Sequence, residues 1–186
     1  MRARSRAALA AALFLVSLTP AAPAQQAGGL VADLLVDIGQ VEEKLLGLAK
    51  AMPESTFGWR PAQGVRASAD VFLHISAENY FLPAAMKVPA PEGTGIKGDD
   101  YKTVQAYEGR QASREQVIAD LETSFAHLKM ALQRTTDAQL REPVSVFGMT
   151  FTGQQFVILI TTHLHEHLGQ LIAYARANGI KPPWSN

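Results

Sequence analysis

The stretch from Thr152 to Gly179 constrains the fold more than any other, because it is a long helical pattern with both ends marked. Thr152 and Gln155 fit a capping box, in which each side chain binds the backbone N–H of the other residue, and Asn178-Gly179 is a typical helix stop. One side of this helix carries an apolar stripe that polar side chains interrupt: Phe156, Ile160, His163, His167, Gln170, Leu171 and Tyr174. A helix of this length with such a stripe must pack against other helices.

Three earlier stretches repeat apolar residues at the spacing of one side of a helix, so we expect three more helices. They cover 30–52, 69–82 and about 114–134. Pro53 ends the first helix, and Ser68 is the expected N-cap of the second, which Pro83 ends or kinks. The third begins with the capping-box pattern Ser113-Arg-Glu-Gln116. Each predicted helix therefore has a start or stop signal of its own.

The connections between these helices differ in length and composition. Residues 54–67 have no sustained period and read as a loop, whereas 88–109 is rich in proline and glycine and should be a long irregular crossover. Residues 144–152, with β-prone pieces around Gly148, should form a small extended loop or hairpin. The sequence has no strong strand pattern and no internal repeat. It therefore predicts an all-α fold, a four-helix bundle with a long crossover connection.

The first 24 residues have the pattern of a signal peptide. Three arginines precede an apolar run over 7–18, and Ala22-Pro23-Ala24 has the small-residue spacing of a cleavage site. The apolar run is shorter than the roughly 20 residues that a membrane-spanning helix needs, which disfavours the alternative of an uncleaved anchor. We therefore expect 1–24 to be removed. This leaves a single domain over 25–186 that is periplasmic or secreted, without stable membrane insertion.

Charge and cysteine content limit the partners of the mature chain. Removing 1–24 takes away three arginines and leaves 14 Lys+Arg against 17 Asp+Glu, a formal charge of −3. A mildly acidic protein has little electrostatic attraction to nucleic acid or anionic lipid, so we expect no nucleic-acid partner. The chain has no cysteine. Any metal must therefore be held by imidazole, carboxylate or water.

Two histidines of the last predicted helix are expected to form half of a metal site. Residues four apart on a helix lie one above the other, so His163 and His167 can direct ring nitrogens at one point. Burying two neighbouring imidazoles without a partner costs desolvation, which favours a shared ion over two independent core histidines. His165 lies about 200° from His163 around the helix, so we exclude it from the ligands. Gln170 and Tyr174 could support the ligands or line a pocket, or pack in the core with a satisfied polar tip.

The second predicted helix supplies the missing groups. Zinc and similar ions usually have at least three protein ligands, and His74, within the apolar stripe of 69–82, is the best remaining candidate. Three imidazoles leave a coordination position open for water or substrate, as in catalytic sites. Glu78, one turn after His74, could bind the ion, transfer a proton or orient a histidine; a carboxylate paired with a basic residue is the alternative. His127 falls off the stripe of its helix, and we expect it to be solvated or flanking.

Four segments together resemble the DinB/YfiT-like superfamily of metal-binding four-helix bundles. They span nearly the whole mature chain: 53–61 followed by Ser68, His-Ile-Ser-Ala-Glu-Asn-Tyr-Phe from His74, His163-x-x-x-His167-Leu-Gly-Gln170, and Tyr174-Ala-Arg-Ala-Asn-Gly-Ile-Lys-Pro-Pro183. The resemblance implies that His74, His163 and His167 are the three metal ligands. It also implies a divalent transition metal, zinc or nickel, that activates a low-molecular-weight thiol, as in the family's S-transferases and isomerase, and it suggests a homodimer.

These observations predict an exported metalloprotein, with the activity of a metal-dependent transferase or hydrolase as the favoured function. A divalent ion would activate a thiol or water for attack on a small electrophile, with Glu78 as the leading proton-transfer residue. One alternative is a non-catalytic periplasmic bundle that binds a metal or small ligand. Another is an inverzincin-type metalloprotease, because His163 to His167 also match H-x-x-E-H. That protease would need a downstream acidic ligand, and no Asp or Glu follows Glu166.

Overall fold

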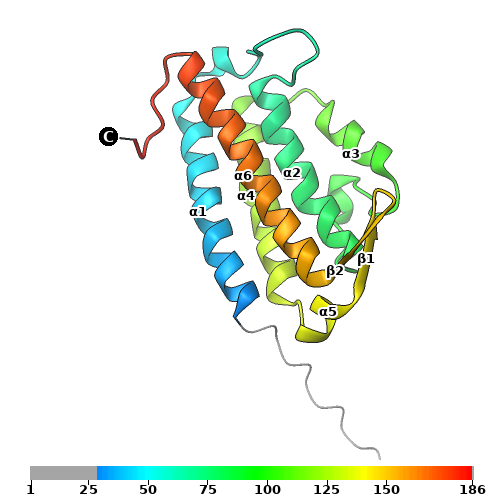
Figure 1. The fold of residues 1–186 in the computed structure, drawn as a ribbon. Helices are drawn as coiled ribbons and strands as arrows, with labels where there is room; N and C mark the ends of the chain where they lie inside the picture. The colour runs from blue at the N-terminus through cyan, green and yellow to red at the C-terminus, as the bar shows by residue number, and fades with distance from the viewer. Residues whose placement is uncertain (1–28, 186) are drawn as a thin grey trace, which may run out of the picture.

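The computed structural model describes residues 29–185, so the predicted signal peptide at 1–24 lies outside the described residues. Four long helices stand side by side along most of the molecule (Figure 1). They are α1 (Leu30–Ala51), α2 (Ser68–Ala85), α4 (Arg114–Gln133) and α6 (Gly153–Ala177). The expected four-helix bundle is confirmed. Within residues 29–185, no helix has both the length and the apolar character that a membrane crossing requires.

The helices form a ring in which each packs against two neighbours, since α1 and α2 both contact α4 and α6. α1 and α6 run in one direction, and α2 and α4 run in the other (Figure 1). Because α2 and α4 are parallel, the chain has to return along the bundle between them, which explains the long crossover. At the start of α4, Arg114 Nε donates to the Met52 carbonyl oxygen just after α1 (3.0 Å).

The interior is filled by the apolar sides of the four long helices. Each contributes large side chains that are fully buried: Leu45 and Leu48 from α1, Phe72 and Ile75 from α2, Phe125 and Leu128 from α4, Phe156 and Ile160 from α6. Burying one side chain of this size contributes about 1.5–3 kcal/mol to folding. Packing of this core, in a chain without cysteine, therefore fixes the spacing of the helices.

The crossover is more ordered than its glycines and prolines suggest. The prediction of an irregular segment over 88–109 is wrong at its C-terminal end, where α3 spans Tyr101–Glu108. Asp100 caps this helix, because its side chain accepts a hydrogen bond from a backbone N–H of the first turn. α3 lies outside the ring, against α2, and buries Val104 and Tyr107 (Figure 1). Short 3-10 turns occur at Glu54–Thr56 and Glu92–Thr94.

A short helix, α5 (Asp137–Arg141), and a β-hairpin connect α4 to α6. The expected small hairpin is confirmed: β1 (Pro143–Val146) pairs antiparallel with β2 (Met149–Thr152). Phe147 and Gly148 form the two-residue turn, and both have a positive φ, 53° and 73°. The strands contact α2 and α6. The tip of the hairpin points towards the start of α3, where the Phe147 ring lies 5.3 Å from that of Tyr101 (Figure 1).

The ends of α2 differ from the predicted ones. Ser68 is the first residue of the helix rather than its N-cap; the N-cap is Ala67, whose N–H donates to the Asp70 carboxylate (2.8 Å). At the other end, Pro83 does not end the helix, which continues to Ala85. Proline removes a backbone donor, and in the last turn of a helix this costs a single hydrogen bond. The sequence therefore located α2 correctly but not its capping residue or its last turn.

His127 has different surroundings from those we expected. We predicted a solvated or flanking histidine, but the side chain is only 7% exposed, and its ring centroid lies 5.4 Å from that of Tyr80 on α2. α2 packs against the side of α4 that carries His127, so the buried side of α4 is wider than its apolar stripe. Burial lowers the pKa of His127, and the ring is therefore neutral near pH 7.

The start of α6 provides a test of the packing. Gly153 approaches α5 so closely that an added Cβ would stand 2.1 Å from the Gln139 carbonyl oxygen and 2.9 Å from Leu140 Cα. Gly153→Ala should therefore lower the free energy of unfolding, measured by urea denaturation, by roughly 1–3 kcal/mol, because the backbone must shift. Gly169→Ala in the same helix is the matched control, since nothing in the described chain lies within 4 Å of its added Cβ. It should raise stability by roughly 0.5–1 kcal/mol. Wild-type stability of Gly153→Ala would contradict this packing.

Candidate metal centre

Three histidines meet where α2 packs against α6. His163 and His167 lie one turn apart on α6, and His74 reaches them from α2. The ring centroids of the α6 pair are 4.5 Å apart, and that of His74 lies 5.2 Å from His163 and 4.7 Å from His167. One ring nitrogen from each residue lies within 4.8 Å of the other two. The structure therefore brings together the three histidines that the sequence selected.

Glu108, at the end of α3, sets the orientation of His74. Its Oε1 lies 2.6 Å from His74 Nδ1. A carboxylate only accepts hydrogen bonds, so Nδ1 carries the hydrogen and Nε2 of the neutral ring keeps its lone pair. Arg66 Nη2 donates to the other carboxylate oxygen, Oε2, at 3.3 Å. Burial raises the pKa of Glu108, but the hydrogen bond from His74 and the charge of Arg66 outweigh burial and leave this pKa below its ordinary value.

A second series of hydrogen bonds orients His167. The Tyr174 hydroxyl donates to the Arg66 carbonyl oxygen (3.3 Å) and accepts from Gln170 Nε2 (2.9 Å). Gln170 Oε1 is then free to accept from His167 Nδ1, at 2.9 Å. The ring of His167 therefore also keeps its lone pair on Nε2. Gln170 and Tyr174 thus lie behind this ring and fix its tautomer.

His163 has a buried nitrogen, Nε2, that lacks a hydrogen-bond partner among the described residues. Burial, reinforced by His167 and His74, lowers the pKa of His163 to about 3, and burial also lowers the pKa of His167. Both rings are therefore neutral at pH 7, the form that binds a metal ion. A buried polar atom without a partner is costly, and an ion shared with the other two rings would remove that cost.

The donor set fits a divalent transition metal. Imidazole suits zinc, copper, iron and nickel, so three rings are compatible with such an ion without selecting one. Three protein ligands also leave a coordination position open. A second group, His74 with Glu78 and Glu108, also places one atom from each residue within 4.8 Å of the others. Glu108 is already bound to Arg66 and to His74, so the three histidines are the better ligand set.

Glu78 lies one turn after His74 and is 4% exposed. Tyr101 of α3 donates its hydroxyl to Glu78 Oε1 (3.1 Å), which leaves Oε2 for another partner. Burial raises the pKa of Glu78, and the neighbouring His74 and the hydrogen bond from Tyr101 offset part of this effect. Burial and the Glu78 charge raise the pKa of Tyr101 to about 12, so the phenol remains a donor at neutral pH. The partner of Glu78 is thus a phenol rather than a basic residue.

A cavity of about 280 Å³ lies beside these groups and includes His74, His163 and Glu78 in its lining. The other lining residues come from α2, α3, the hairpin and α6: Leu82, Tyr101, Phe147, Met149, Leu159, Thr162 and Glu166. Phe147 and Met149 are 53% and 52% exposed, so the cavity reaches solvent. The histidine cluster is therefore accessible to a small molecule from one side.

A family model described as the DinB superfamily matches residues 38–171, which include the three histidines, Glu78 and Glu108. The chain belongs to the DinB superfamily. The resemblance predicted from the sequence is therefore confirmed, together with the bundle fold. No curated protein matches the chain.

Solved structures of DinB-like proteins have the same fold. A DinB-like protein from Bacillus cereus ATCC 10987 is 17% identical, with a TM-score of 0.67 over 83% of this chain and 97% of that one. YfiT from Bacillus subtilis, described as a probable metal-dependent hydrolase with an unusual four-helix bundle topology, is 17% identical, with a TM-score of 0.66 over 83% and 91%. A mutant of the mycothiol-dependent maleylpyruvate isomerase is 11% identical, with a TM-score of 0.59 over 76% and 60%.

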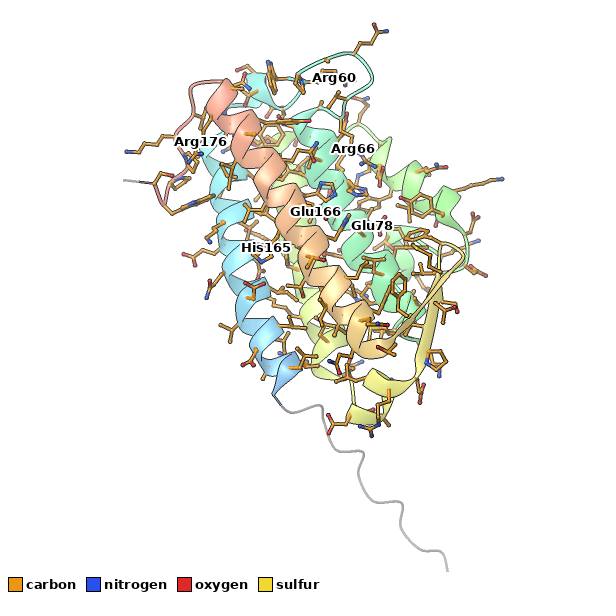
Figure 2. All side chains as sticks on the ribbon, in the orientation of Figure 1. Arg60, Arg66, Glu78, His165, Glu166 and Arg176 are labelled. Atoms are coloured by element: carbon orange, nitrogen blue, oxygen red, sulfur yellow. The ribbon has the colours of Figure 1, made fainter. Side chains whose placement is uncertain are left out.

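Two polar neighbours of the histidine pair lie outside the cluster. His165 is on the α1 side of α6, where its Nε2 lies 2.7 Å from Asp37 Oδ2 (Figure 2). Glu166 is exposed and lies between α6 and α2 at the edge of the cavity (Figure 2). In this DinB-superfamily protein, the third ring beside His163 and His167 comes from α2. The third member of the cluster thus precedes the H-x-x-E-H match in the chain, whereas an inverzincin would take a further ligand downstream of it.

Sequence reasoning missed four residues that border the site: Arg66, Tyr101, Glu108 and Phe147. They lie before α2, in α3 and at the hairpin tip, in segments without the helical period that selected the histidines. Glu108 contacts His74 across 34 positions, and no local pattern predicts that pairing. The one usable signal was the length of the crossover, since long connections often carry pocket walls.

The neutral state of His163 predicts how the stability of this DinB-superfamily protein depends on pH. A histidine in the unfolded chain has a pKa of about 6.5, whereas burial lowers the pKa of His163 to about 3 in the folded protein. Between these values the unfolded state binds more protons, so metal-free protein loses stability as the pH falls. His163→Leu removes this contribution. Urea denaturation in EDTA should therefore show that the free energy of unfolding falls less in the variant than in the wild type between about pH 7.5 and about pH 5.5.

The interval from about pH 7.5 to about pH 8.5 is the control for this experiment, because it lies above the pKa of His163 in both states. There, the stability difference between the two proteins should stay constant. If the free energy of unfolding fell equally in both proteins between about pH 7.5 and about pH 5.5, folding would not disfavour protonation of His163.

Proposed function

We propose that this protein is an exported metal-dependent enzyme, a transferase or hydrolase that acts on a small electrophile. His74, His163 and His167 would hold one divalent transition metal, zinc or nickel. The observation that carries the proposal is the placement of these rings and a buried carboxyl group beside a cavity that reaches solvent. When bound there, such an ion lowers the pKa of a water or thiol and stabilises negative charge that develops on the electrophile.

Glu78 is the residue that we assign to proton transfer. Its raised pKa makes the carboxylate a stronger base than an exposed glutamate, as a general base requires. Tyr101 holds Oε1, so Oε2 can accept a proton from a water or thiol in the cavity. The phenol keeps its own proton and therefore stabilises the ionised carboxylate between turnovers.

Glu108 and Arg66 are positioning residues in this proposal. A carboxylate behind a ligand histidine fixes the tautomer and increases the basicity of the ring. Glu108 makes this contact with His74 Nδ1, and the guanidinium of Arg66 keeps the carboxylate ionised and in place. The carbonyl oxygen of the same Arg66 ends the hydrogen-bond series behind His167. One loop residue before α2 therefore supports both of these rings.

Two structures that share the fold support the chemistry. YfiT of Bacillus subtilis is described as a probable metal-dependent hydrolase, and the isomerase is described as mycothiol-dependent. These descriptions favour a metal and a small-molecule substrate, with water or a thiol as the nucleophile. The rival function is a non-catalytic bundle in which the ion ties α2 to α6. Such a tie needs no access for a ligand, and the cavity beside Glu78 therefore favours turnover.

The proposed location is the periplasm or the medium, after cleavage of the signal peptide at 1–24. The substrate would then be a small molecule that the protein meets outside the cytoplasm. The homodimer suggested by the family resemblance stays a prediction, which the mass of the mature protein in solution would test.

Metal content tests the ligand assignment. Mature protein loaded with zinc or nickel and then dialysed should retain about one ion per chain, measured by elemental analysis, because three imidazoles form a single site. Alanine at His74, His163 or His167 should remove most of that metal. His165→Ala is the matched control and should retain it. Glu108→Gln should weaken the affinity by roughly 10–100-fold, as expected for loss of a supporting carboxylate. Wild-type metal content in both His163→Ala and His167→Ala would refute the assignment.

Turnover tests the role of Glu78. Metal-loaded protein should be assayed on a panel that pairs small thiols with electrophiles and includes ester and amide substrates. Glu78→Gln should lower kcat by roughly 10²–10⁴-fold without loss of metal, because the amide cannot accept the proton. Glu142→Gln, at an exposed carboxylate paired with Lys87, is the control and should keep wild-type kcat. Activity that is unchanged in Glu78→Gln would exclude this residue as the base, and a metal-loaded protein inactive on the whole panel would favour the non-catalytic bundle.

A further inference from the structure

The turn of the β-hairpin contains a residue that its backbone disfavours. Phe147 and Gly148 both have a positive φ, and a two-residue hairpin turn with this property is of type I′. Such turns favour Asn-Gly, because asparagine tolerates a left-handed conformation and a bulky side chain does not. Strained residues of this kind tend to occur where a ligand is held. Phe147 therefore needs an explanation from its surroundings.

The ring of Phe147 lies over the cavity in an aromatic group with Phe81 and Tyr101. It stacks on Phe81 at 5.8 Å between centroids and 28° between planes, and it meets Tyr101 edge to face at 5.3 Å and 87°. The side chain is nevertheless 53% exposed, so the fold buries only part of it. One face or edge of the ring thus remains available to a molecule in the cavity, whose lining includes Phe147 and Tyr101.

Apart from an ion held by the histidines, the charged side chains that line the cavity are all acidic. Its lining contains two acidic side chains, Glu78 near the histidines and Glu166 at the exposed edge, and it contains no lysine or arginine. The rest of the wall is largely apolar: Leu82, Tyr101, Phe147, Met149 and Leu159. Along this apolar wall an anionic group would lose hydration and meet the charge of Glu166, whereas an uncharged apolar group would gain by burial.

We infer that the cavity takes a small uncharged molecule with an aromatic or similarly flat apolar group, and that Phe147 is a specificity-determining residue that contacts this group. The reactive end of the molecule would lie towards Glu78 and the histidines, and its apolar end under the hairpin tip. The strained turn is thereby explained, because it holds a ring at the open side of the cavity. This inference names the substrate class of the proposed function and rests on that function only for the link to catalysis.

Two fluorescent probes with the same body test the inference on metal-free protein. N-phenyl-1-naphthylamine is uncharged, and 8-anilinonaphthalene-1-sulfonate adds a sulfonate to the same rings. The uncharged probe should bind at least about tenfold more tightly, because the sulfonate meets Glu78 and Glu166. Glu166→Gln should reduce the difference in affinity between the two probes, because it removes one of the two negative charges. Equal or tighter binding of the sulfonate probe, or no binding of either probe, would overturn the inferred ligand class.

Phe147→Asn separates a role in binding from a role in folding. Asparagine suits the turn, so the variant should unfold at the same or a higher temperature than the wild type. Its affinity for N-phenyl-1-naphthylamine should nevertheless fall about tenfold, since an aromatic contact and its apolar area are lost. Phe147→Tyr keeps the ring and should keep the affinity. Val36→Asn, which changes an exposed apolar residue on α1, is the matched control and should leave the affinity for the probe unchanged.

The outcomes distinguish this inference from the proposed function. Wild-type probe affinity in Phe147→Asn would overturn the role of Phe147, whatever the protein catalyses. Conversely, a metal-loaded protein inactive on the substrate panel would contradict the proposed function, and the probe results would still decide the ligand class of the cavity. Probe binding requires neither metal nor turnover. A failure of the inferred ligand class and a failure of the proposed catalysis would therefore be observed separately.

Discussion

Burial of three imidazoles at the contact between α2 and α6 is the constraint on which the rest of the site depends. A charged ring in this position would lose its hydration, and burial therefore keeps His163 and His167 neutral. A neutral ring has one donor and one acceptor, and the buried donor needs a partner. Glu108 supplies that partner to His74, and Gln170 supplies it to His167. One ring nitrogen of each residue lies within 4.8 Å of the other two, as a metal centre requires.

Two carboxyl groups beside these rings have opposite environments, and this difference separates their roles. Glu108 is held by a guanidinium and an imidazole N–H, which keep its pKa low and make it a fixed negative partner for His74. Glu78 is bound by a single phenol in a more buried place, where desolvation raises its pKa. Environments that push two pKa values apart in this way separate acid–base roles. In the proposed function, Glu108 orients a metal-binding histidine and Glu78 accepts a proton.

Helical periodicity was sufficient to predict the bundle and the histidine cluster, because both depend on which side of a helix a residue occupies. It predicted that His163 and His167 lie on the inner side of their helix and His165 on another side, and that His74 lies within the apolar stripe of the second helix. It could not find Glu108, whose contact with His74 spans 34 positions and arises only when α3 packs on α2. It also misplaced His127, because a second helix covers the flank of α4 and no property of α4 alone reveals its neighbour.

The topology explains why a histidine cluster between helices becomes a lined cavity. Parallel α2 and α4 require a return connection, and α3 lies in that connection. The two ends of α3 carry Tyr101 and Glu108, which contact Glu78 and His74, one turn apart on α2. The hairpin before α6 then brings Phe147 against Tyr101. A bundle with short loops could bury the same three rings, but it would leave them without an orienting carboxylate and without a wall for a ligand. Departure from the simplest bundle connectivity therefore supplies both the carboxylate that orients His74 and the wall of the cavity.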